Sequence, residues 1–142
     1  MKKAVLFCCC LFFGFAMMSE SYLGVWEQVN KHGEKGGLVE ITKTAQNIYV
    51  GTVIQIHGYS QNLVCTRCKG KFHNQPIVGL QCIFNMVNKG GKLTKGEIID
   101  VKTGKIYHAN IQYDSEKDAL IVRASIDAAG RFGETQIWKR HK

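Results

Sequence analysis

Apolar and polar residues alternate along most of the chain, and the alternation stops at short clusters of glycine, asparagine, aspartate and lysine. This period of two is typical of β-strands with one buried face, and no stretch sustains the 3.6-residue period of an amphipathic helix. The pattern predicts eight strands, over residues 22–29, 38–43, 47–57, 77–87, 93–100, 105–113, 119–125 and 134–140. We therefore expect an all-β domain.

Most of the predicted strands are joined by short turns. Residues 88–91 read Asn-Lys-Gly-Gly, and the turn over residues 100–104 ends in Gly104, where a glycine can supply a positive φ. Successive strands joined in this way pair antiparallel, and closing the sheet removes its exposed edges. The predicted fold is an eight-stranded antiparallel up-and-down barrel, whose interior holds side chains or one small ligand.

The first residues have the pattern of a secretory signal peptide. Two lysines precede an apolar run over residues 4–18, and a polar stretch follows it. The run falls short of the roughly 20 apolar residues that a transmembrane helix needs, so we expect no transmembrane anchor. Gly14 and Ala16 are suitably small for cleavage after Ala16, although cleavage as late as Ser21 is an alternative.

These features predict two segments, a signal peptide over residues 1–16 and a single β-barrel domain over residues 17–142. The expected location is secreted or periplasmic. Cleavage would remove Lys2 and Lys3, which lowers the formal charge from +8 to +6.

The remaining basic residues are spread over predicted turns instead of forming one basic face with aromatic residues between them. This spacing argues against nucleic-acid binding and leaves only weak attraction to an anionic envelope surface. The acidic residues are dispersed singly, and no glycine-rich phosphate loop follows a strand. We therefore expect a protein that is not an enzyme.

The long connection over residues 58–75 contains Cys65 and Cys68. In an oxidising compartment this pair favours a disulfide, and a redox role is open to it. A zinc site formed by Cys65, Cys68, His57 and His73 is the alternative, because these residue types bind zinc. No other cofactor is expected. A loop of this length is a candidate lid over one mouth of the barrel or a surface for a partner.

Candidate residues for a ligand cavity come from the apolar and aromatic rows of the predicted strands. Arg123 has two interpretations: it points inward to a carboxylate or phosphate, or it reaches the rim and pairs with a surface acid. The candidate cavity residues are Tyr49, Val53, Leu80, Phe84, Tyr107, Ile111 and Arg123.

Several short motifs follow one another along the chain in a characteristic order. They are Gly24-Val25-Trp26, Val39-Glu40-Ile41, Tyr49-Val50-Gly51, Cys65-Thr66-Arg67-Cys68-Lys69-Gly70, Pro76-Ile77-Val78-Gly79-Leu80, Gly96-Glu97-Ile98-Ile99-Asp100, Gly104-Lys105-Ile106-Tyr107, Leu120-Ile121-Val122-Arg123, Gly133 and Thr135-Gln136-Ile137-Trp138-Lys139-Arg140. In this order the chain resembles a family of small exported bacterial proteins of unknown function.

The resemblance implies a calycin barrel similar to that of the lipocalins. It also implies that Trp26 and Arg140 form a stacked clamp at the closed end of the barrel. The first functional hypothesis is a carrier for a small apolar or amphipathic molecule in the barrel. The alternatives are a surface interaction module that uses residues 58–75, and a redox or zinc role of the Cys65/Cys68 pair.

Overall fold

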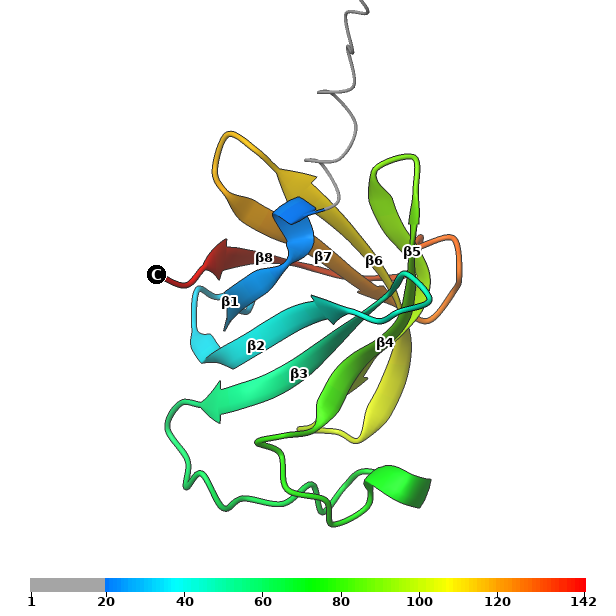
Figure 1. Cartoon of the computed structure of the whole chain (residues 1–142). Helices are drawn as coiled ribbons and strands as arrows, with labels where there is room; N and C mark the ends of the chain where they lie inside the picture. Colours follow the sequence, from blue (N-terminus) through cyan, green and yellow to red (C-terminus); the bar gives the residue numbers. More distant parts are fainter. Residues whose placement is uncertain (1–19) are drawn as a thin grey trace, which may run out of the picture.

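The structure, a computed structural model, describes residues 20–142, and within them eight strands form one barrel (Figure 1). Two short 3-10 turns are the only helical elements among these residues, η1 (Glu20–Tyr22) and η2 (Gly70–Phe72). The strands are β1 (Gly24–Val29), β2 (Lys35–Lys43), β3 (Ile48–Ile56), β4 (Gln81–Lys89), β5 (Lys92–Asp100), β6 (Lys105–Asp114), β7 (Ala119–Ser125) and β8 (Gly133–Arg140).

Each strand pairs antiparallel with the next one in sequence, and the last strand returns to the first. β8 closes the barrel on β1 through the pairs Trp26–Arg140 and Glu27–Lys139. The predicted fold class, an eight-stranded antiparallel up-and-down barrel, is therefore confirmed. The predicted signal peptide over residues 1–16 lies outside the described residues. None of the helices among residues 20–142 has the length and hydropathy to cross a bilayer.

The fourth strand differs most from its prediction, because it begins at Gln81 and not at residue 77. Gly79 has a φ of +97°, and the Leu80 amide donates to the carbonyl of Ile77, so the chain turns just before the strand. The connection between β3 and β4 consequently extends over residues 57–80. Alternation alone cannot detect such a turn, since Val78 and Leu80 continue the apolar row of the strand.

The side chains of β6 and β7 alternate as predicted, with Ala109, Ile111, Leu120 and Val122 buried inside the barrel. β4 does not, because its pairing with β3 shifts twice and Asn85 adopts a positive φ of 61°. Such bulges place an extra residue in one strand and reverse the facing of the residues beyond it.

The barrel has two different ends. We call the end formed by η1 and the turns over residues 44–47, 90–91 and 115–118 the closed end. We call the end formed by the loops over residues 30–34, 57–80, 101–104 and 126–132 the mouth. The interior near the closed end is filled by large side chains that are almost completely buried, namely Tyr22, Trp26, Tyr49, Met86, Leu93, Ile111 and Leu120.

Candidate functional site: the barrel cavity

A cavity of about 1040 Å³ extends from the interior of the other half of the barrel out between the mouth loops. Residues from all four mouth loops line it. Its size matches the upper end of the roughly 300–1,000 Å³ range of pockets that hold small molecules. The inner wall is mainly apolar and includes Val53, Ile77, Cys82, Ile98, Val122 and Trp138.

Polar side chains also line the cavity, among them Gln28 of β1, Tyr107 of β6 and Gln136 of β8. Tyr107 is half-buried, and its hydroxyl has no hydrogen-bond partner among residues 20–142. Gln136 accepts a hydrogen bond of 2.8 Å from Nε1 of Trp138, which leaves its amide nitrogen without a protein acceptor within the same residues. These two groups can bind the polar part of a ligand, because a polar group in an apolar site needs a partner.

Cys82 also lines the cavity, and its thiol is buried. Burial raises the pKa of Cys82 to about 12. The thiolate is the nucleophilic form of cysteine, so this side chain acts here as a small apolar part of the wall.

The closed end is sealed by Arg140, whose guanidinium lies 4.2 Å from the ring centre of Trp26. Nη1 and Nη2 donate to the carbonyls of Leu23 and Ser21 at 3.0 and 2.8 Å, and Nε donates to Asp118 at 2.9 Å. The cation is therefore fully engaged by a stacked ring, two carbonyls and a carboxylate.

Tyr22 continues this seal inside the barrel. Its hydroxyl donates to the carbonyl of Gly91 at 2.6 Å and accepts from the amide of Tyr113 at 3.2 Å. The Trp26 Nε1 group donates to the carbonyl of Tyr22 at 2.9 Å. Because the polar groups of Arg140, Tyr22 and Trp26 are engaged by other protein groups, these side chains offer little to a ligand.

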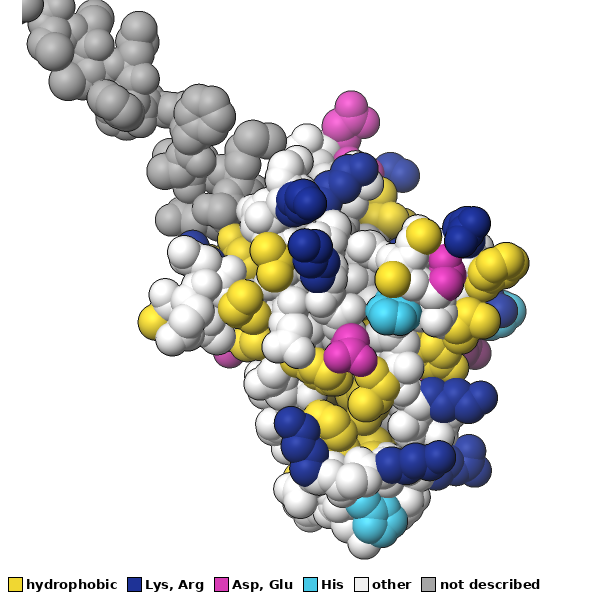
Figure 2. Space-filling view, turned by 90° about the vertical axis from the view of Figure 1, so that its right-hand side faces the viewer, with side chains coloured by type: hydrophobic (Ala, Val, Ile, Leu, Met, Phe, Trp, Pro, Cys, Tyr) yellow, Lys and Arg dark blue, Asp and Glu magenta, His cyan; other side chains and the backbone are white. Residues whose placement is uncertain are grey.

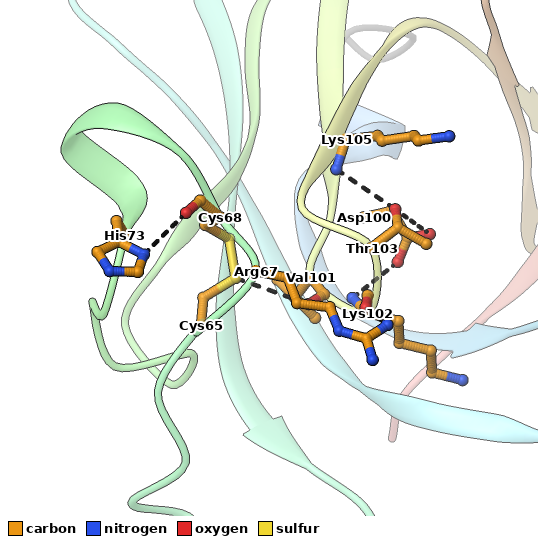
Figure 3. Close-up of a disulfide and its surroundings, with 9 residues drawn as sticks. All are labelled: Cys65, Arg67, Cys68, His73, Asp100, Val101, Lys102, Thr103 and Lys105. Carbon is orange, nitrogen blue, oxygen red and sulfur yellow. Dashed lines mark hydrogen bonds between the residues drawn. A yellow bond between two sulfur atoms is a disulfide. The ribbon is translucent and has the colours of Figure 1, made fainter.

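The loop between β3 and β4 lies against the β5–β6 turn (Figure 3), and its residues Thr66 and Arg67 line the cavity. Cys65 and Cys68 form a disulfide, with their Cα atoms 5.4 Å apart. Between them, Arg67 donates from Nη1 to the carbonyl of Lys102 at 3.1 Å. Gly104, with a φ of +76°, lies directly against the Arg67 carbonyl, where a side chain would collide with the backbone. The β5–β6 turn thus supports the disulfide segment.

The residues of the alternative zinc site are used in other ways. The two cysteines are bonded to each other, so neither is a thiolate that could bind a metal. His73 Nδ1 lies 3.0 Å from the Cys68 carbonyl, and His57 Nε2 lies 3.8 Å from a Glu27 oxygen. Among the described residues, no group of three or more His, Cys, Asp or Glu side chains could hold a metal ion.

Of the seven candidate cavity residues, Val53 and Tyr107 line the cavity and the others do not. Tyr49 and Ile111 face inward, but they belong to the packed half of the barrel. Leu80 is buried in the turn before β4, where its carbonyl accepts from the amide of Val53.

Phe84 and Arg123 take other positions, which corrects the assignment of both to the cavity. The bulges of β4 place Phe84 where it stacks on Phe72 of η2, with ring centres 5.9 Å apart. Arg123 faces away from the inward row of β7 and binds the next loop. Its guanidinium donates to the carbonyls of Gly130 and Arg131 at 2.9 and 3.2 Å and to the Thr135 hydroxyl at 3.1 Å.

Sequence reasoning did not select Val122, Gln136 and Trp138 as cavity residues. The alternation along β8 could have indicated that Gln136 and Trp138 both face the interior, because they are two residues apart and share a face. The mouth residues that line the cavity come from loops without periodicity, and no sequence pattern marks them.

A closed eight-stranded barrel with a cavity open at one end is the architecture of the lipocalins. The structure is similar to that of protein HP1028 from Helicobacter pylori, described as belonging to the lipocalin family. The TM-score is 0.75 at 18% sequence identity, over 85% of this chain and 83% of that one. At this identity the similarity concerns the fold.

The family model for an uncharacterized protein conserved in bacteria (DUF2147) matches residues 24–140. The chain therefore belongs to this family, which agrees with the resemblance found in its motifs. No curated protein sequence matches the chain.

Proposed function

We propose that this protein is exported and that it binds or carries one small amphipathic molecule in the barrel cavity, without catalysing a reaction. The observation that carries the proposal is the cavity itself, which combines an apolar wall with the Tyr107 hydroxyl and the Gln136 amide. An apolar chain would occupy the wall, and these two groups would bind a polar end. The lipocalin family named for the structural neighbour supports a binding role.

Two features support export. The apolar run over residues 4–18 follows two lysines, as in a secretory signal peptide. The Cys65–Cys68 disulfide suits an oxidising compartment, since such bonds are rare in the reducing cytosol.

A fluorescent fatty acid, dansyl-undecanoic acid, tests the binding proposal. We expect the purified protein to bind one molecule with enhanced dansyl fluorescence, and native mass spectrometry to show a one-to-one complex. Ala124 lines the cavity, so Ala124→Trp should occupy part of it and weaken binding by about tenfold or more, since lost burial of a few CH₂ groups is worth this much.

Ile137→Trp is the matched control, because Ile137 is 42% exposed on the neighbouring strand β8 and does not line the cavity. This variant should bind the probe as the unmodified protein does. Circular dichroism and the unfolding transition would verify that both variants keep the fold. Equal binding by all three proteins, or no binding by the unmodified protein, would contradict the proposal.

A further inference from the structure

The most exposed large apolar side chains of the described residues are gathered at the mouth. Ile126 is 71% exposed, Phe132 65% and Tyr59 64%, and all three line the opening of the cavity. The other exposed large apolar residues are at 45% or less. Leu63, also at the opening, is one of them. Apolar side chains held in water at one place usually mark an interaction surface.

The loop over residues 126–132 holds its apolar residues in a defined position. The carboxylate of Asp127 accepts hydrogen bonds from the amides of Phe132 and Arg131 at 2.8 and 3.0 Å. The Ile126 amide donates to the Phe132 carbonyl at 2.9 Å, and the Arg123 guanidinium binds the same loop from β7. These hydrogen bonds fix the loop conformation that exposes Ile126 and Phe132 to solvent. Without them, the loop could fold both side chains toward the barrel interior.

The four mouth loops differ in character around the opening. The β3–β4 loop carries Tyr59 and the β7–β8 loop carries Ile126 and Phe132, whereas the β1–β2 and β5–β6 connections carry Lys31 and Lys102. Because the strands follow one another around the closed barrel, the two loops with exposed apolar tips are separated on each side by a loop that carries a lysine. The β3–β4 loop carries a cation as well, Arg67. On the side of the molecule shown in Figure 2, basic side chains lie beside apolar ones.

Two of the mouth cations are available for an anionic partner. Lys31 and Lys35 lie 3.5 and 3.4 Å from carboxylates of Glu134 and Glu27. Arg67 and Lys102 form no ion pair among residues 20–142, and Arg67 uses only Nη1 to bind the Lys102 carbonyl. Figure 3 shows the Arg67 side chain beside the β5–β6 turn, to which Lys102 belongs.

We infer that the mouth docks on the surface of a lipid bilayer that contains anionic lipids. Apolar side chains at loop tips insert at the boundary between head groups and acyl chains, and lysine or arginine binds the anionic head groups. The apolar tips stand on opposite sides of an opening, an arrangement that a deformable bilayer can cover more readily than a rigid protein surface. This docking goes beyond the proposed carrier function, because it requires no ligand in the cavity.

Vesicle flotation tests the inference, with vesicles of phosphatidylcholine alone and of phosphatidylcholine mixed with phosphatidylglycerol. The protein should float with the anionic vesicles and much less with the neutral ones. The rim variant Ile126→Thr/Phe132→Thr should lose about tenfold in vesicle binding, because two partly inserted side chains are removed from the apolar region. Lys102→Gln should weaken binding to anionic vesicles only, and added salt should abolish that difference.

Matched controls come from positions away from the mouth. Ile106→Thr/Ile137→Thr removes two side chains that are 45% and 42% exposed on the outer wall, and Lys92→Gln removes an exposed charge at the closed end. Neither should change vesicle binding. The inference is overturned if the protein binds neither vesicle type, or if the outer-wall variant loses as much vesicle binding as the rim variant. It is also overturned if the rim variant changes only self-association in solution.

These variants leave Val53, Tyr107, Val122 and Gln136 intact, so the two proposals fail separately. A protein that floats with vesicles but binds no dansyl-undecanoic acid would contradict the carrier function alone. A protein that binds the probe but never floats would contradict the docking alone.

Discussion

The two ends of this barrel are built in opposite ways. At the closed end, Arg140 is stacked on Trp26 and bonded to a carboxylate and two carbonyls, and the hydroxyls of Tyr22 and Tyr113 both have partners. At the mouth, the Tyr107 hydroxyl has no partner among residues 20–142, and Phe132 stands in solvent. The comparison indicates that the closed end mainly stabilises the fold, whereas the mouth has groups available to bind a ligand or a surface.

Trp26→Ala should give the largest effect and tests the comparison most directly. The side chain is completely buried, so its removal leaves a cavity and should cost about 3–5 kcal/mol in the free energy of unfolding. Tyr59→Ala, at the mouth, is the matched aromatic truncation and should change it by less than about 0.5 kcal/mol. Urea denaturation of both variants measures the difference, and similar costs would show that the two ends are not distinct.

Gly104→Ala should have the next largest effect and probes how the mouth loop is attached. The residue has a φ of +76° and no room for a Cβ beside the Arg67 carbonyl. Gly90→Ala is the matched control at the closed end, with a φ of +62° and open space around it. The control should cost about 1 kcal/mol for the backbone conformation alone.

Gly104→Ala should cost more than this control, about 2–3 kcal/mol, because the Arg67 backbone must also move. Detachment of the β3–β4 loop should make residues 57–80 more sensitive to limited proteolysis. If the two alanine variants unfold at the same urea concentration and are cleaved alike, the loop is not supported by this turn.

Much of the fold was predictable, because the alternation of apolar residues is a direct consequence of a barrel with one buried face. The apolar inward rows of β6 and β7 follow from it, although Arg123 of β7, a candidate cavity residue, faces away from the interior. The same alternation carries no information about depth along the barrel axis. Tyr49 and Tyr107 both face inward, yet one packs at the closed end and the other lines the cavity.

The remaining differences also have physical causes. Phe84 faces outward because bulges in β4 reverse the alternation, and Arg123 binds the carbonyls of a loop that has no regular pattern. The exposure of the rim residues Ile126 and Phe132 could not be predicted from the sequence. In a loop without periodicity, the sequence does not distinguish an exposed apolar residue from a buried one. The exposure of these two rim residues depends on the hydrogen bonds of Asp127, which only the folded chain shows.

Asp118→Asn should have the smallest effect on stability, and this effect should depend on pH. Burial of the Asp118 carboxyl opposes ionisation, but hydrogen bonds from Arg140 and Tyr113 outweigh it and lower the pKa of Asp118. A lowered pKa in the folded state contributes stability above the unfolded value of about 3.9, and this contribution is lost as the pH falls through the folded pKa. Because the side chain is 41% exposed, the variant should lose only about 0.5–1 kcal/mol at pH 7.

The difference in unfolding free energy between the unmodified protein and Asp118→Asn should therefore be largest near neutral pH and shrink below about pH 4. Glu116→Gln is the control, since its exposed carboxylate lies in the same turn and has no hydrogen-bond partner among residues 20–142. It should leave the pH profile of stability unchanged. A loss for Asp118→Asn that stays constant down to pH 2, measured by urea denaturation at each pH, would mean that the packing of Asp118 matters and its charge does not. The closed end would then be held without the Asp118 charge, and Arg140 would act through its stack on Trp26 and its two carbonyl partners.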